Sequence, residues 1–162
     1  MEERFLIRAA SRADVPELLR LIRELAIYEK LEHEAVGTPA ALERSMFGDR
    51  PECEALVAEV AGRAVGFALF FISFSTFLCK PGLYLEDLFV EPAQRGSGIG
   101  KALLGRLAAI AVERGYGRFE WRVLDWNEPS IRFYEALGAK IMREWLLARV
   151  TGPALRELAA RG

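Results

Sequence analysis

Three glycines at alternate positions constrain this chain more than any other feature of its 162 residues. Gly96, Gly98 and Gly100 form a loop between two apolar segments. The segment Tyr84–Val90 before the loop predicts a strand, and the residues from Ile99 to Ala111 after it are apolar at helical spacing. Glycine lets backbone N–H groups approach an anion closely, and the first turn of a helix adds the positive end of its dipole. The sequence therefore predicts a strand–loop–helix unit that binds a phosphate or pyrophosphate.

The loop differs from two common nucleotide-binding motifs. A P-loop requires glycine five residues before its Gly-Lys pair and Ser or Thr after it, where this chain has Arg95 and Ala102. A dinucleotide fingerprint that starts at Gly96 requires a small residue where Lys101 stands. Arg95 and Lys101 could add positive charge to an anion site. The alternative is a flexible glycine-rich turn that binds no ligand.

The rest of the chain predicts one mixed sheet with helices on its faces. We expect strands at 5–8, 56–60, 64–75, 84–90, 119–124, 140–143 and 145–150, and helices at 11–29, 38–48, 99–115, 129–137 and 151–160. A capping box that begins at Ser11 predicts the start of the first helix, and Thr38 caps the second. Pro81-Gly82 is expected to separate the long hairpin strand from the next one. A chain of this length predicts one domain.

Composition and charge disfavour several classes of protein. The chain has 22 Lys and Arg against 23 Asp and Glu, and the net charge of −1 does not support nucleic-acid binding through a broad basic face. Two cysteines and one histidine are too few for a structural zinc site, and His33 lies in a charged stretch typical of a solvated loop. No segment resembles a signal peptide or reaches the roughly 20 apolar residues of a membrane helix. Two unpaired cysteines, Cys53 and Cys79, fit a reduced cytosol, so we expect a cytoplasmic protein.

The segment 95–100, RGSGIG, resembles the R/Q-x-x-G-x-G/A acyl-CoA signature of the GNAT superfamily of N-acetyltransferases. The segments 24–29 (ELAIYE), 84–90 (YLEDLFV) and 126–134 (WNEPSIRFY) resemble its diamine (spermidine/spermine) and thialysine acetyltransferase branch. The similarity extends over nearly the whole chain. It implies an α/β (α+β) fold, a single GNAT domain over residues 1–162 with a twisted, mixed and mostly antiparallel sheet flanked by helices. It also implies acetyl-CoA as co-substrate, no metal, and a homodimer whose interface includes the C-terminal strands.

The resemblance implies which residues bind acetyl-CoA. In the family, a bulge in the strand before the glycine loop frees backbone N–H groups that polarise the acetyl carbonyl, although this sequence by itself shows no bulge. The implied contacts are Leu88, Phe89, Val90, Arg95, Gly96, Ser97, Gly98, Ile99, Gly100, Lys101, Asn127, Pro129, Ser130 and Tyr134.

Acetyl transfer from a thioester to an amine requires a deprotonated amine, a polarised carbonyl and a proton for the departing thiolate. A lysine-like amine with a pKa near 10.4 is uncharged in only about one molecule in 2,500 at pH 7, so a general base helps. We expect Glu86 to be this base, acting directly or through water, and Tyr134, a phenol protonated at pH 7, to protonate the thiolate. The family resemblance implies that Glu86 contacts the amine. Strand alternation predicts that Glu86 and Asp87 point to opposite faces, and helical spacing puts Ser130 and Tyr134 on one face.

The acceptor amine is expected to contact residues that match the branch. These are Tyr28, Glu29, Glu86, Glu120, Trp121, Arg122 and Glu144. The glutamates suit a diamine or polyamine, which is the predicted acceptor, whereas Arg122 favours an amine that carries a carboxylate. The alternatives are a thialysine-like or lysine-like amino acid, a protein amine, or a non-catalytic acyl-CoA-binding module.

Overall fold

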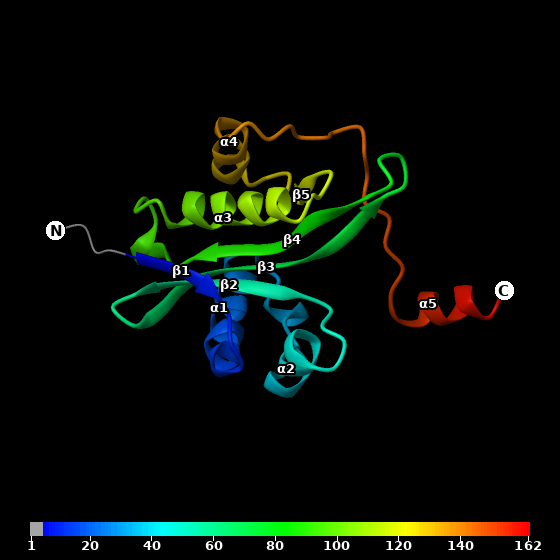
Figure 1. Cartoon of the computed structure of the whole chain (residues 1–162). Helices are drawn as coiled ribbons and strands as arrows, with labels where there is room; N and C mark the ends of the chain where they lie inside the picture. The colour runs from blue at the N-terminus through cyan, green and yellow to red at the C-terminus, as the bar shows by residue number, and fades with distance from the viewer. Residues whose placement is uncertain (1–4) are drawn as a thin grey trace. The chain divides into compact units, whose positions relative to one another are not determined.

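A computed structural model describes residues 5–162, and its centre is a five-stranded sheet in the order β1-β2-β3-β4-β5 (Figure 1). The strands are β1 (Phe5–Ala9), β2 (Glu54–Val60), β3 (Arg63–Ser75), β4 (Lys80–Val90) and β5 (Phe119–Trp121). Neighbours from β1 to β4 are antiparallel, and β4 and β5 are parallel. The predicted mixed, mostly antiparallel sheet is confirmed.

Helices cover both faces of this sheet (Figure 1). α1 (Val15–Tyr28), which follows a 3-10 turn at Arg12–Asp14, and α2 (Pro39–Phe47) lie on one face, and α3 (Ile99–Glu113) lies on the other. Two further 3-10 turns are Glu32–Glu34 and Pro92–Gln94. The predicted caps are present: the Ser11 N–H donates to the Asp14 carboxylate at 2.7 Å, and the Thr38 hydroxyl accepts from the Ala41 N–H at 3.2 Å.

The core on the α1 side is continuous from helices to sheet. Its buried residues are Leu18, Leu21, Leu25, Met46, Ala55, Val57, Ala64, Phe67, Leu69 and Phe89. On the opposite face α3 buries the apolar residues that predicted it: Ile99, Leu103, Leu104, Leu107, Ile110 and Ala111. β4 therefore lies between two packed layers.

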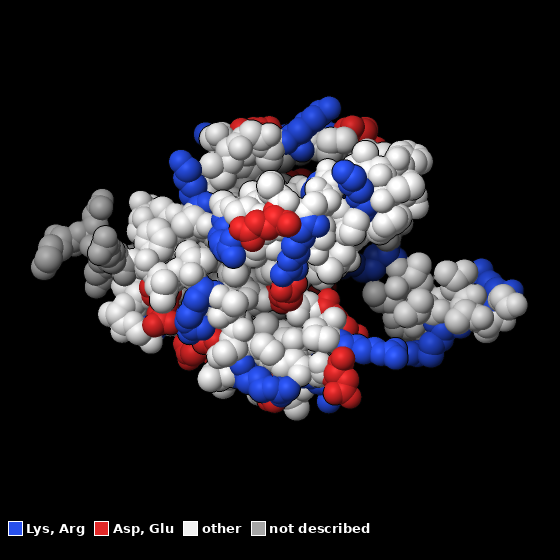
Figure 2. Space-filling model, viewed as in Figure 1, with Lys and Arg blue, Asp and Glu red and all other residues white. Residues whose placement is uncertain are grey.

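The described chain divides into two compact units after Arg122. The first contains the sheet with α1 to α3, and the second contains α4 (Glu128–Ala136) and α5 (Gly152–Ala159). No helix within residues 5–162 combines the length and apolar character needed to cross a bilayer. Acidic and basic side chains are interspersed on the face of the molecule that Figure 2 shows.

Two predicted strand boundaries are wrong. β4 begins at Lys80, so Pro81 and Gly82 lie inside the strand. A Cβ on Gly82 would stand 2.8 Å from the Ser73 hydroxyl, and this close approach is why glycine occupies a strand interior. β5 ends at Trp121, three residues earlier than predicted.

Residues 140–150, which were predicted to form two strands, form none. The second unit contains no strand, so this segment has no strand partner within its own unit. Apart from half-buried Ile141, its apolar side chains are exposed instead, with exposed fractions of 74% at Trp145 and 92% at Leu146.

Candidate active site

A β-bulge in β4 forms the centre of the candidate site. Leu85 pairs with Phe70 and Asp87 pairs with Leu69, so Glu86 has no partner on β3. An extra residue in one strand bends it and re-aims the side chains beside it, and such bulges are common next to active sites. The bulge that the family resemblance implied is therefore present, at Glu86.

The bulge brings polar side chains to one face of the sheet. Tyr84 lies opposite Phe71 and Asp87 lies opposite Leu69. Because Phe71 and Leu69 are two residues apart on β3, they share a face, and so do their partners. This face is the one that α1 covers, since Leu69 belongs to the α1 core. The predicted alternation between Glu86 and Asp87 assumed a regular strand, and the bulge at Glu86 removes that assumption.

Three carboxylates, Glu29, Glu86 and Asp87, form what we call the acidic cluster. Burial raises the pKa of Asp87 to about 6, helped by the negative charges of Glu86 and Glu29 and opposed by Arg122. Burial also raises the pKa of Glu29, which directly follows α1. The sequence pattern favoured Glu86 over Asp87 as the base, because a regular strand would have turned Asp87 away from Glu86.

Arg122 stands where β4 and β5 separate. The last pair between these strands joins Leu85 to Trp121, so Arg122 lies one residue beyond it, next to the bulge. Its Nη2 atom is 3.7 Å from Oε1 of Glu86, and its guanidinium carbon is 5.9 Å from the centre of the Tyr84 ring. The positive charge of Arg122 therefore lies next to the acidic cluster.

The other predicted acceptor residues of β5 have local partners. The carboxylate of Glu120 is 2.7 Å from the Arg118 guanidinium, and the Trp121 ring packs on Phe119 with centres 4.8 Å apart. Both predicted residues are half-buried. Glu120 is therefore already paired with the arginine that directly precedes β5.

Beyond Leu85, β4 has one free edge. The Glu91 N–H donates to the Val65 carbonyl at 2.9 Å. Since antiparallel pairs alternate in bonding direction, Leu88 and Val90 point their N–H and C=O groups away from β3. No strand within residues 5–162 pairs with that edge. Two backbone N–H groups therefore face outward beside the acidic cluster.

The glycine loop follows this edge. Gly96 and Gly98 have φ angles of +83° and +88°, a region that side chains disfavour. Gly98 is the N-cap of α3 and offers no capping side chain, so the N–H groups of the first turn, at Ile99, Gly100 and Lys101, have no side-chain acceptor from the cap. The Ser97 hydroxyl closes the loop by donating to the Gln94 carbonyl at 2.6 Å. This geometry fits a phosphate group.

Arg95 ties the loop to α1. Its guanidinium carbon is 4.9 Å from the centre of the Tyr28 ring and 5.7 Å from that of Phe89, and its Nε–H donates to the Val90 carbonyl at 3.1 Å. Tyr28, a predicted acceptor residue, thereby contacts the arginine of the glycine motif. These contacts connect the glycine loop to the C-terminal end of α1.

A buried carboxylate fixes the end of β4. Glu91 accepts hydrogen bonds from Arg63 at 2.8 and 2.6 Å and from Arg20 at 2.7 Å. Burial alone raises the pKa of Glu91, but the two guanidinium groups outweigh it and hold that pKa below its usual value. This network connects α1, β3 and β4 directly before the glycine loop.

The second unit holds the remaining predicted residues. The Asn127 side chain caps α4 by accepting from the Ser130 N–H at 3.4 Å, and Pro129 lies in the first turn. Tyr134 is buried in α4, with 9% of it exposed, whereas Glu144 is exposed in the segment 140–150.

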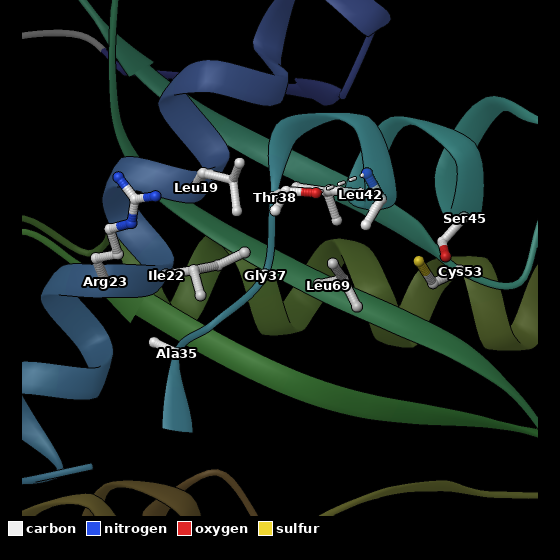
Figure 3. A pocket seen from close by; sticks show the side chains of 11 residues that line it. Leu19, Ile22, Arg23, Ala35, Gly37, Thr38, Leu42, Ser45, Cys53 and Leu69 are labelled. Atoms are coloured by element: carbon white, nitrogen blue, oxygen red, sulfur yellow. Dashed lines mark hydrogen bonds between the residues drawn. The ribbon is translucent and has the colours of Figure 1, made fainter. Parts of the chain in front are cut away.

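An apolar pocket of about 330 Å³ opens between α1, α2 and β3 (Figure 3). None of the predicted site residues lines this pocket. The lining residues are Leu19, Ile22, Arg23, Ala35, Gly37, Thr38, Ala41, Leu42, Ser45, Cys53 and Leu69. Burial and the neighbouring Glu52 and Glu54 raise the pKa of the Cys53 thiol, which disfavours a thiolate. Among residues 5–162, no three His, Cys, Asp or Glu side chains are grouped to hold a metal ion.

Known proteins resemble this chain along most of its length. The sequence profile of the acetyltransferase (GNAT) family matches residues 19–139. Thialysine N-epsilon-acetyltransferase of Mus musculus is 38% identical, over 96% of this chain and 97% of its own. Spermidine/spermine N(1)-acetyltransferase-like protein 1 of Homo sapiens is also 38% identical over 96% of this chain, which matches 24% of that protein. A solved integron cassette protein from V. cholerae has a TM-score of 0.81 at 27% identity, over 98% of both chains.

Proposed function

The chain belongs to the acetyltransferase (GNAT) family, and from this premise we propose that it transfers the acetyl group of acetyl-CoA directly to a primary amine of a small molecule, in a ternary complex. The curated relatives named above act on thialysine or resemble a polyamine acetyltransferase, which supports a small amine as acceptor. No covalent acyl-enzyme is required, and the raised pKa of Cys53 argues against that thiol as a nucleophile.

The outward N–H groups of Leu88 and Val90 are the observation that carries this proposal. An acetyl carbonyl laid along the free edge of β4 would accept from them, and fixed backbone donors stabilise the oxyanion that develops as the amine attacks. The adjoining glycine loop, with uncapped N–H groups at the start of α3, suits the diphosphate of CoA. Loop and edge are consecutive in sequence, so one bound thioester would contact both.

The acidic cluster supplies the base. Glu86 is the exposed member and binds the incoming ammonium, directly or through water, while Asp87, with a pKa of about 6, is ionised at pH 7 and accepts its proton. The amine nitrogen then forms a bond to the acetyl carbon as the carbon–sulfur bond breaks. Tyr134 donates its phenolic proton to the departing thiolate, and the second proton that the nitrogen loses as it becomes an amide passes to water or restores the Tyr134 phenol. The products are an N-acetyl amine and CoA.

A homodimer is the proposed assembly. The exposed apolar side chains of the C-terminal segment support it, since Trp145, Leu146, Leu147, Leu155 and Leu158 each expose at least half of their surface. A second copy would offer the strand partner that residues 140–150 lack. Two free cysteines, Cys53 and Cys79, are consistent with a cytoplasmic location.

The deciding experiment measures CoA thiol release over a panel of diamines, polyamines, amino acids and peptides. Tyr134→Phe should lower kcat by about 10²- to 10⁴-fold while acetyl-CoA binding is retained, because the ring keeps its packing and loses only the hydroxyl that donates the proton. An unchanged rate in this variant would remove Tyr134 from the mechanism. Acetyl-CoA binding without turnover of any amine would favour the non-catalytic acyl-CoA-binding module, and activity on peptides alone would favour a protein amine.

A further inference from the structure

Arg122 is a cation placed among the carboxylates that would receive the amine. We propose that Arg122 determines acceptor specificity by binding a carboxylate of the substrate, so that the enzyme prefers amino acids over the matching polyamines. The inference rests on the proposed acetyl transfer and adds the chemical class of its acceptor.

The position of Arg122 gives it access to the same small molecule as Glu86. It is the first residue after the β4–β5 pairing ends, and its Nη2 lies 3.7 Å from Oε1 of Glu86. An ammonium bound at Glu86 would therefore be only a few ångströms from the guanidinium. The two side chains are each nearly half exposed, at 45% and 41%, so a ligand can reach both.

The ion pair of Arg122 is looser than the other arginine–carboxylate pairs of the first unit. Arg8, Arg20 and Arg114 hold their carboxylates at 2.7 to 2.8 Å, within the range of charge-assisted hydrogen bonds. At 3.7 Å, the Arg122–Glu86 contact is an ion pair without a hydrogen bond. A guanidinium carries five N–H donors in a planar fork that matches a carboxylate. One donor of Arg122 is directed to the Tyr84 hydroxyl, and the remaining donors can bind a carboxylate.

Charge balance at the site opposes a polyamine. A second ammonium close to Glu86 would face Arg122, and like charges repel. Glu120, one of the carboxylates that suited a polycation, is 2.7 Å from Arg118 and is already neutralised. An amino acid carries both complementary charges: its ammonium would bind the acidic cluster, and its carboxylate would bind Arg122.

The test uses two pairs of acceptors that differ only by a carboxylate: L-lysine with 1,5-diaminopentane, and L-ornithine with 1,4-diaminobutane. CoA release is measured at saturating acetyl-CoA. We expect the wild type to favour each amino acid by at least tenfold in kcat/KM. Arg122→Gln should reduce kcat/KM for lysine by about 10- to 100-fold, mainly through KM, and leave 1,5-diaminopentane unchanged or improved. Arg122→Glu should reverse the preference.

Lysinamide and one control variant separate specificity from structural damage. Lysinamide lacks the negative charge of lysine and should behave like 1,5-diaminopentane in every variant. Arg106→Gln removes an equally exposed guanidinium, paired with Glu113 at 3.0 Å on α3, and should leave all ratios unchanged. An equal loss for both members of a pair in Arg122→Gln would overturn the inference, as would a wild type that does not discriminate.

The role of Arg122 can also be tested if the protein transfers no acetyl group. If no amine releases CoA, titration of lysine and 1,5-diaminopentane into the CoA-bound protein by calorimetry still tests Arg122. Tighter binding of lysine, lost in Arg122→Gln, would support the carboxylate site although transfer fails. Equal or absent binding of the two would overturn it. An aromatic amine without a carboxylate as the best substrate would instead point to the apolar pocket beside Leu69 and would also overturn the inference.

Discussion

The two halves of β4 differ in their neighbouring strands. One half is part of the packed sheet, and the other carries the candidate active site. From Lys80 to Leu85 the strand lies between β3 and the β5 region, and Leu83 and Leu85 are buried. From Glu86 to Val90 it pairs only with β3, and this half carries the bulge, the acidic residues and the outward N–H groups. A strand paired on both sides has no backbone donor left for a ligand. The loss of one neighbour is what makes the second half a candidate site.

The largest effect on stability is expected from truncating a side chain in the half of β4 that is paired on both sides. Leu83 has no exposed surface, so Leu83→Ala should lower the free energy of unfolding by about 2 to 5 kcal/mol. The same truncation at half-buried Leu88, in the open half, should cost less than about 1.5 kcal/mol. Urea unfolding monitored by circular dichroism measures both. Equal losses would show that the two halves contribute equally to stability.

A smaller effect of opposite sign is expected at Asp87. Its pKa is about 6 in the folded chain against an ordinary value of 3.8, so its ionisation destabilises the fold. The stability that the protonated form contributes is fully present below about pH 3.8 and is lost as the pH rises through about 6. Asp87→Asn should therefore raise the free energy of unfolding at pH 8 by about 1 to 3 kcal/mol, and hardly at pH 3.5.

The same variant should lose activity while it gains stability. In the wild type, kcat/KM should increase as the pH rises through about 6 and Asp87 ionises, and this limb should disappear in Asp87→Asn. Asp49→Asn, at an exposed aspartate, serves as the control and should change neither property. A wild-type limb near pH 6 that persists in Asp87→Asn would assign the base to another group.

The smallest expected effect lies in the glycine loop that follows the open half. Gly98→Ala forces a side chain into a φ of +88°, and this strain at the start of α3 should weaken acetyl-CoA binding by about tenfold. Gly105→Ala in the middle of α3 is the matched control: nothing lies within 4 Å of its added Cβ, and it should stabilise the helix by up to about 1 kcal/mol without affecting binding. Calorimetric titration with acetyl-CoA distinguishes them.

Elements whose signals are local could be predicted from the sequence. The capping box at Ser11 and the Thr38 cap act within a few residues, and each lies where predicted. The β2–β3 hairpin was also predicted, because its turn and its strands are contiguous. The strands at 140–143 and 145–150 were predicted from apolar pattern alone and are absent. Such a pattern states that a strand is possible, whereas the strand itself needs a partner.

The features of the candidate site also fall into two groups: local ones that could be predicted from the sequence, and tertiary ones that could not. The sequence by itself determined the strand–loop–helix unit, its glycine conformations and the presence of Glu86, Asp87 and Arg122, because these depend on residue type and spacing. Only the tertiary structure decided that the strand bulges at Glu86, that Asp87 lies with Tyr84 on the α1 face, and that Arg122 lies 3.7 Å from Glu86. The physical reason is register: which residue of β4 goes unpaired, and where β5 stops, depend on contacts between segments far apart in the chain.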